Sequence, residues 1–268
     1  MGSVVANYYL EAWSRTLEKY GISNVVFYGG VLRLEDLRIP YGRLSVRICD
    51  NSDDSMGNYW YHFTCTGRSL FLLHDIPSKG YLFAHDDALL NLSRLSMMDT
   101  NVSWFTYDPN HLTEPPGVPP DLANDAQVQS DPWGQLVKPF GAAAVLQALS
   151  NEEFAANYKK SLWECLPYPG LSLPRGQADV FFISSSQLTT FQKAAALFAK
   201  FGIFLEIAVP SIAHCVLRDF KSISLYTRWD NAGRGKPPPP GTDVNVIQPL
   251  KISAPEIRDF MDKFLDMM

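Results

Sequence analysis

The sequence lacks the features that mark membrane proteins and nucleic-acid-binding proteins. No hydrophobic run approaches the roughly 18 residues of a membrane-spanning helix. There is also no run of Lys and Arg that would form the basic face needed to bind a phosphate backbone. The net charge is −5, from 23 basic and 28 acidic side chains. We therefore expect no membrane segment in these residues and no nucleic-acid partner.

Several enzyme signatures are missing too. The chain has no GxGxxG after a strand, no Walker loop, no G-x-S-x-G elbow and no H-E-x-x-H spacing. The sequence therefore lacks the usual signatures of four enzyme classes: dinucleotide oxidoreductases, P-loop enzymes, α/β-hydrolases and zinc hydrolases. The four cysteines show no CxxC spacing and read as buried thiols or at most two disulfides, so they do not fix a compartment. Two N-x-S sequons, at Asn91 and Asn101, permit secretory residence but such tripeptides often arise by chance.

What is present is enough apolar material for a sizeable core. Of the 268 residues, 46% are hydrophobic and 13% aromatic. Helical spacing over residues 10–20 ends at Gly21, where a helix C-cap belongs, and a strand follows at 24–28. A short β-like run at 4–6 precedes that helix, and together they form a βαβ unit, which implies a parallel sheet.

Further elements are predicted along the rest of the chain. Strands are expected at 43–50, 80–87 and 179–183, with an extended segment around 102–105. Helices are expected at 59–73, at 142–162, from a cap at Ser186 to Gly202, and at the C-terminus with Phe260 and Phe264 on one face. Residues 108–133 are rich in Pro, Asp and Asn and indicate a long loop or insertion. The alternation of these elements predicts an α/β fold.

Two adjacent carboxylates, Asp86 and Asp87, follow an apolar run that begins at Gly80. Burying a charge costs several kcal/mol unless a partner compensates it. Because oxygen-only ligands suit Mg²⁺ and Mn²⁺, the pair indicates a metal–diphosphate site at the carboxyl end of a strand. The alternative is that both aspartates cap a helix that begins at Ala88. A second pair, Asp53-Asp54, lies in a polar stretch and carries a weaker signal.

Three further side chains are candidates for the same chemistry. Glu206 is a lone acid within seven apolar residues, so it is either a general base with a raised pKa or a structural acid bonded to a partner. Lys251 could neutralise a diphosphate or extend to the surface, and neither reading is favoured. His214 follows eight residues after Glu206 and is a weaker candidate for the same cleft.

Four sequence stretches resemble the GT-A class of nucleotide-sugar glycosyltransferases. More narrowly, they resemble the STELLO-like group (domain of unknown function 288), which is related in outline to exostosin-type transferases. The resemblance spans residues from about Asn7 to Ser253 and is carried by the following runs: Gly80-Tyr81-Leu82-Phe83-Ala84-His85-Asp86-Asp87-Ala88-Leu89-Leu90-Asn91, Val102-Ser103-Trp104-Phe105, Phe204-Leu205-Glu206-Ile207-Ala208-Val209-Pro210 and Ile247-Gln248-Pro249-Leu250-Lys251-Ile252-Ser253.

The resemblance implies a GT-A (Rossmann-like) fold with a mixed, mainly parallel sheet flanked by helices. Residues 1–268 would form one domain, with the nucleotide-sugar and metal half at about 1–107, the acceptor half at about 134–268, and 108–133 as the loop between them. The implied cofactors are Mn²⁺ or Mg²⁺ and a donor such as a UDP-sugar. The implied partner is a glycan, protein or small-molecule acceptor.

The resemblance also implies residue roles. Asp87, with Asp86 beside it, would bind the metal, Asp86 and Lys251 would contact the nucleotide, and Glu206 would be catalytic. Two departures weigh against this reading: the acidic motif is His-Asp-Asp rather than Asp-x-Asp, and Gln248 stands where family members often have His. They keep open a non-catalytic GT-A-fold scaffold or carbohydrate-binding subunit. A phosphohydrolase that uses Asp86 is a third reading, which lacks further acidic motifs.

The donor sugar, the acceptor, the stereochemistry and the oligomeric state are not encoded in these patterns. The compartment is also open. The Golgi lumen is expected if an N-terminal anchor has been removed, and the cytoplasm otherwise. Aromatic residues that could form a sugar platform, or that could equally belong to the core, are Trp104, Trp133 and Trp229.

Overall fold

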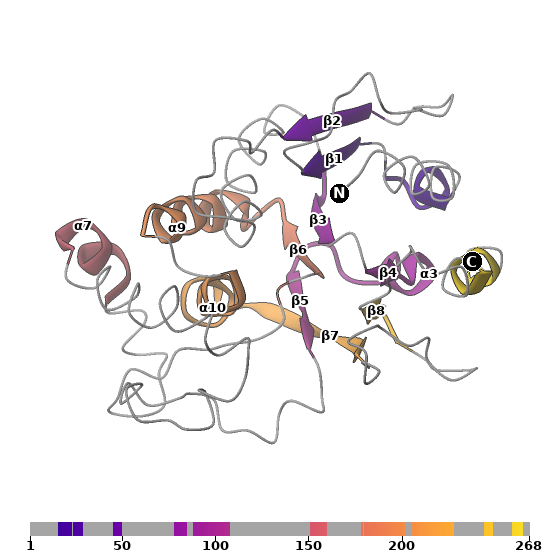
Figure 1. Cartoon of the computed structure of the whole chain (residues 1–268). Helices are drawn as coiled ribbons and strands as arrows, with labels where there is room; N and C mark the ends of the chain where they lie inside the picture. The colour runs from indigo at the N-terminus through magenta and orange to yellow at the C-terminus, as the bar shows by residue number, and fades with distance from the viewer. Residues whose placement is uncertain are drawn as a thin grey trace. The chain divides into compact units, whose positions relative to one another are not determined.

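The computed structural model describes residues 16–22, 24–28, 45–49, 78–84, 88–107, 151–159, 178, 180–201, 205–227, 244–248 and 259–264. Its strands are β1 (Asn24–Tyr28), β2 (Ser45–Cys49), β3 (Gly80–Ala84), β4 (Leu89–Leu90), β5 (Ser103–Tyr107), β6 (Val180–Ser184), β7 (Phe220–Thr227) and β8 (Val246–Gln248) (Figure 1). Its labelled helical segments are α3 (Leu92–Leu95), α7 (Glu152–Phe154), α9 (Leu188–Lys200), α10 (Leu205–Ser211) and the π-helical η3 (Ala155–Lys159) and η4 (Ile212–Leu217). Residues 16–19 and 259–264 are helical as well.

The strands form a mixed arrangement. β1 and β2 pair in parallel, and the other six strands are ordered β3-β6-β5-β7-β8-β4. Within this order β7 and β8 are parallel, whereas β5–β6 and β4–β8 are antiparallel. The prediction of an α/β fold with a mixed sheet is confirmed. A mainly parallel sheet stays a prediction, because the described registers include both parallel and antiparallel pairs.

The chain divides into two compact units, each built from separate stretches of sequence. Unit 1 comprises Met1–Ser55, Phe83–Asp99 and Ile223–Met268, and unit 2 comprises Met56–Leu82 and Thr100–Ser222. Each unit therefore draws on segments from both halves of the chain. The predicted single GT-A domain and its sequential halves stay predictions. The predicted loop at 108–133 lies entirely outside the described residues.

Unit 2 has an aromatic core between strands and helices. Figure 1 shows α9 and α10 on the same side of strands β5 and β6. Phe191 of α9 contacts Phe181 of β6, which stacks in turn on Phe105 of β5 with ring centroids 5.8 Å apart. Side chains alternate across a strand, so the neighbouring pair Trp104 and Phe182 stacks on the opposite face, with centroids 5.1 Å apart. The bulky residues of β5 and β6 thus fill both faces of this strand pair.

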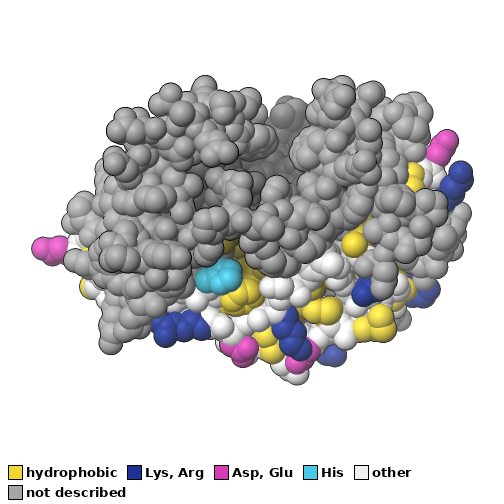
Figure 2. Space-filling view, turned by 90° about the horizontal axis from the view of Figure 1, so that it is seen from below, with side chains coloured by type: hydrophobic (Ala, Val, Ile, Leu, Met, Phe, Trp, Pro, Cys, Tyr) yellow, Lys and Arg dark blue, Asp and Glu magenta, His cyan; other side chains and the backbone are white. Residues whose placement is uncertain are grey.

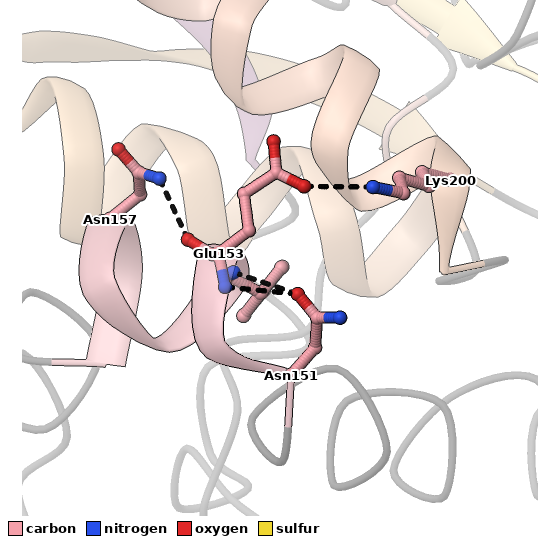
Figure 3. A network of polar contacts seen from close by, with 5 residues as sticks. Asn151, Glu153, Asn157 and Lys200 are labelled. Atoms are coloured by element: carbon pink, nitrogen blue, oxygen red, sulfur yellow. Dashed lines mark hydrogen bonds and ion pairs between the residues drawn. The ribbon is translucent and has the colours of Figure 1, made fainter.

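A capped turn and an ion pair attach α7 to α9. The side-chain oxygen of Asn151 accepts hydrogen bonds from the N–H groups of Glu153 (3.1 Å) and Phe154 (3.2 Å), and so caps α7 (Figure 3). Lys200 at the end of α9 contacts the Glu153 carboxylate at 2.7 Å, with both side chains more than half exposed. An exposed pair of this kind contributes about 0–1 kcal/mol. Packing must therefore supply most of the attachment.

That packing comes from an aromatic cluster beneath the ion pair. Phe154 and Phe198 are fully buried, with ring centroids 5.1 Å apart. Tyr158 and Phe201 contact the same Phe154 ring at 5.5 Å each. Burial raises the pKa of the Tyr158 hydroxyl above its ordinary value, which keeps that group neutral. The cluster accounts for the helical stretch found within the predicted helix at 142–162.

In unit 1, the first described helix ends as the sequence predicts. Gly21 has φ of 76°, a conformation that glycine adopts without a Cβ penalty. Its N–H bonds to the carbonyl of Glu18, and the N–H of Ile22 bonds to the carbonyl of Leu17 at 2.9 Å. These two bonds define a Schellman motif, and they satisfy carbonyl groups that the helix end would otherwise leave unpaired.

A buried polar junction joins β4, β7 and β8 in the same unit. The side-chain oxygen of Asn245 accepts from the N–H (3.1 Å) and the hydroxyl (2.7 Å) of Ser224. The Asn245 carbonyl accepts from the N–H of Asn91 at 2.9 Å. Leu89 and Val246, both fully buried, belong to the apolar core around this junction.

Most of the other predicted elements that fall on described residues are confirmed. The strands predicted at 24–28, 43–50 and 179–183 correspond to β1, β2 and β6, and the extended segment around 102–105 is β5. The helix expected after Ser186 is α9. The predicted cap is wrong, because the Ser186 hydroxyl bonds to Ser184 (2.9 Å) and to the carbonyl of Asn101 (3.3 Å). The predicted elements at 4–6 and 59–73 lie outside the described residues.

Candidate functional site

The strand that leads to the acidic pair is present. β3 runs from Gly80 to Ala84, and its last residue is exposed. The chain is described again at Ala88, which is buried. Asp86 and Asp87 lie between these points, outside the described residues, so their role as metal ligands stays a prediction. The last described residue of β3, Ala84, precedes Asp86 by two positions.

The stretch after the pair decides against the proposed capping role. Leu89–Leu90 forms strand β4, so no helix begins at Ala88. The next helix, α3, starts at Leu92 and takes its cap from Asn91, whose side-chain oxygen accepts from the N–H of Arg94 at 3.3 Å. Asp86 and Asp87 therefore do not cap a helix that begins at Ala88. Helix capping at Ala88 therefore does not explain why two adjacent carboxylates occur between strands β3 and β4.

Glu206 lies in a helix with an unusual backbone. It is the second residue of α10, and Pro210 stands four positions later in the same helix. Proline has no N–H, so it cannot make the ordinary α-helical bond to the Glu206 carbonyl oxygen. The helix then continues as the π-helical η4. Short π-helical segments often occur at functional sites, where they change which side chains face a cleft. The Glu206 side chain itself lies outside what the structure describes.

His214 lies two helical turns further along the same helix. The residue is exposed at the surface, but its ring contacts Phe220 edge-on, with centroids 4.7 Å apart, and this partial burial lowers the pKa of the imidazole below its ordinary value. Figure 2 shows a face on which a histidine, drawn in cyan, stands beside hydrophobic side chains. Eight residues of helix correspond to about 12 Å along the axis. Direct contact of His214 with Glu206 is therefore not expected.

One predicted sugar-platform residue belongs to the core. Trp104 is 3% exposed and stacks on Phe182. A ring buried in this way cannot present a face to a sugar, so the platform reading is wrong for this residue. Trp133 and Trp229 lie outside the described residues.

Buried polar atoms in unit 2 are a feature that the sequence patterns did not reveal. Among the described residues, Trp104 Nε1, Gln192 Nε2 and Ser211 Oγ are buried and have no hydrogen-bond partner. Leaving such a group unpaired costs about 1–3 kcal/mol. Unpaired buried groups in native proteins are therefore uncommon, and they often mark a bound water, a bound ion or a functional role. Ser211 ends α10, the helix that carries Glu206, and Gln192 lies in α9, which packs against α10 and η4. A polar residue on the apolar face of α9 was the available sequence signal.

The remaining predicted site residues can be placed only in part. Gln248 ends β8, where its backbone pairs with Thr227, and Lys251 lies outside the described residues. Within the described ranges, no three His, Cys, Asp or Glu side chains gather in a way that could hold a metal ion. The described helices include none that is long and apolar enough to cross a membrane.

Comparison of the chain with protein families, with curated proteins and with solved structures found no match. The resemblance to GT-A glycosyltransferases therefore rests on the sequence motifs.

Proposed function

We propose that this chain is a metal-dependent glycosyltransferase that moves a sugar from a nucleoside-diphosphate sugar to a hydroxyl acceptor. The observation that supports the proposal is the adjacent pair Asp86-Asp87, which lies in the sequence between strands β3 and β4, with no helix at Ala88 that would need capping. Two carboxylates supply the oxygen donors that Mg²⁺ and Mn²⁺ prefer. The oxygen donors of the two carboxylates thus fit the metal. The alternative role, capping a helix at Ala88, is ruled out by strand β4.

The residue roles follow from the charge that develops during transfer. Asp87, with Asp86 beside it, would hold the ion, which when bound offsets the negative charge on the leaving diphosphate. Lys251 would add a positive charge near the same phosphates. Glu206 would accept a proton from the acceptor hydroxyl if the reaction inverts the anomeric centre, or would align the acceptor if the reaction retains it.

A ligand-binding assay with a matched control tests the proposal. We expect UDP with Mn²⁺ to raise the melting temperature of the protein, because a ligand that binds only the native state stabilises it. Asp87→Asn should abolish the increase without lowering the melting temperature of the free protein. Asp54→Asn, in the polar Asp53-Asp54 stretch, should leave the increase unchanged. An equal increase in the Asp87 variant would contradict the assignment.

A second candidate is a non-catalytic module of the same fold. It is favoured by the His-Asp-Asp motif and by Gln248, which replaces a potential histidine ligand. This module would bind UDP and Mn²⁺ in calorimetry yet transfer no sugar and hydrolyse no donor over long incubation. Detectable Mn²⁺-dependent donor hydrolysis would decide for the enzyme.

A further inference from the structure

A buried disulfide gives information about the compartment that the cysteine spacing did not give. Cys215 in η4 is disulfide-bonded, and the residue is fully buried. Structural disulfides persist in oxidising compartments such as the secretory pathway and are rare where glutathione keeps thiols reduced. Chains that fold in the secretory pathway also meet the machinery that glycosylates N-x-S sequons, and this chain has two of them.

The sequon at Asn101 has the geometry of a modifiable site. Asn101 is exposed in the turn before β5. The sequon's third residue, Ser103, is fully buried, and its hydroxyl accepts from the N–H of Ser184 at 3.0 Å. The N–H of Ser103 donates to the side-chain oxygen of Gln187 at 3.1 Å. These bonds fix the end of the turn within unit 2 while the asparagine is exposed at the surface.

The sequon at Asn91 has the opposite geometry. Its side-chain nitrogen lies 3.4 Å from the carbonyl oxygen of Val244, and its side-chain oxygen accepts from the Ser93 hydroxyl at 2.7 Å. The flanking residues Leu90 and Leu92 are 6% and 2% exposed. A sugar on this nitrogen would have to displace the contact to Val244 and would disturb the cap of α3.

We infer that this chain folds in an oxidising secretory compartment and that its folded form carries an N-linked glycan on Asn101 and none on Asn91. In the modification, Nδ2 of Asn101 bonds to C1 of a lipid-diphosphate-linked oligosaccharide supplied by the host. The C1–O bond to the diphosphate breaks, the lipid diphosphate leaves with the bonding electrons, and Nδ2 loses one proton. The two cysteine thiols lose two protons and two electrons to a host thiol–disulfide oxidoreductase. The inference does not depend on the proposed glycosyltransferase activity.

Secretion of the full chain from cultured eukaryotic cells behind a cleavable signal peptide tests the glycan. Digestion with an N-glycosidase should shift the secreted protein by the mass of one glycan, and peptide mass spectrometry should place the glycan on Asn101. Asn101→Gln should abolish the shift and leave thermal unfolding close to that of the deglycosylated parent. Ser93→Ala, which destroys only the Asn91 sequon and spares the cap, should leave the shift unchanged. A secreted, folded protein without a glycan, or with one on Asn91, would overturn the assignment.

Disulfide mapping tests the compartment separately. Peptide mapping without reductant should find Cys215 bonded to Cys49, Cys65 or Cys165 in the secreted protein. Reduction should lower the melting temperature by roughly 5–15 °C, because a native disulfide restricts the unfolded chain and its loss destabilises the folded state. Protein from a reducing bacterial cytosol should show the lower value and recover the higher one on oxidative refolding. A free Cys215 thiol in the secreted protein, with melting unaffected by reductant, would contradict the inference.

Discussion

Gly80, the first residue of β3, lies directly against Phe182 of β6. A Cβ atom at this position would overlap the Phe182 ring and the backbone carbonyl oxygen of Ile183. The Phe182 ring is already stacked on Trp104 and has little freedom to move aside. The hydrogen bond from the Ser185 N–H to the Lys79 carbonyl, 3.0 Å, holds the two segments together at the same point. The close contact of Gly80 with Phe182 thus holds the start of β3, the strand that precedes Asp86 and Asp87, against β6.

Gly80→Ala should therefore destabilise the protein. Overpacking a closed site typically costs 1–3 kcal/mol, and a clash with backbone cannot be relieved by a rotamer change. Urea unfolding should show the loss, and Ala84→Ser, at the exposed end of the same strand, should change stability by less than about 0.5 kcal/mol. Unchanged stability of Gly80→Ala would show that the strands do not approach as closely as described.

Phe154→Ala should destabilise the protein far more than loss of the nearby ion pair. Truncating a fully buried Phe costs about 3–5 kcal/mol through lost burial and the cavity that remains. Glu153→Gln removes the ion pair with Lys200. Because both side chains are exposed, this substitution should lower the free energy of unfolding by only about 0–1 kcal/mol. Chemical denaturation of both variants compares the contribution of the buried Phe154 ring with that of the ion pair. Equal losses would mean that the aromatic cluster does not attach α7 to α9.

Acidification should destabilise the protein partly through His214. Burial lowers the pKa of this imidazole in the folded state, so the unfolded chain binds a proton more readily. The stability contributed by the neutral ring is fully present above the unfolded pKa, about 6.5. It is lost as pH falls from that value through the lowered folded pKa. The melting temperatures of the parent and of His214→Gln, measured from pH 8 to pH 5, should differ by a constant amount above about pH 6.5 and approach each other as the pH falls below it. Parallel curves would contradict the assignment.

The elements that could be predicted from sequence are those specified locally. Gly21 ends its helix because glycine tolerates positive φ, and the apolar run at 180–183 forms β6 because it suits a buried strand. Strand direction is not encoded in such runs, so the antiparallel pairing of β5 with β6 could not be predicted from them. The sequence suggested a helix that begins at Ala88 with Asp86 and Asp87 as its cap, whereas the helix begins at Leu92 with Asn91 as its cap. Only the hydrogen bonds of Asn91 reveal this.

For the candidate site, sequence predicted the residue types but not their setting. A lone acid in an apolar run drew attention to Glu206, yet its helix, and the π-helical continuation after Pro210, depend on tertiary packing. The unpaired Gln192 and Ser211 atoms likewise arise only once α9 and α10 pack together. A tryptophan that could have lined a sugar site proved to be a core residue for the same reason.

Calorimetric titration of UDP, with Mn²⁺ present or absent, into the parent protein and Asp87→Asn tests the central claim most directly. The account predicts saturable, Mn²⁺-dependent binding to the parent and none to the variant, whose melting temperature without ligand equals that of the parent. Binding of equal strength to both proteins, or no Mn²⁺ dependence in the parent, would contradict a metal–diphosphate site at Asp86 and Asp87.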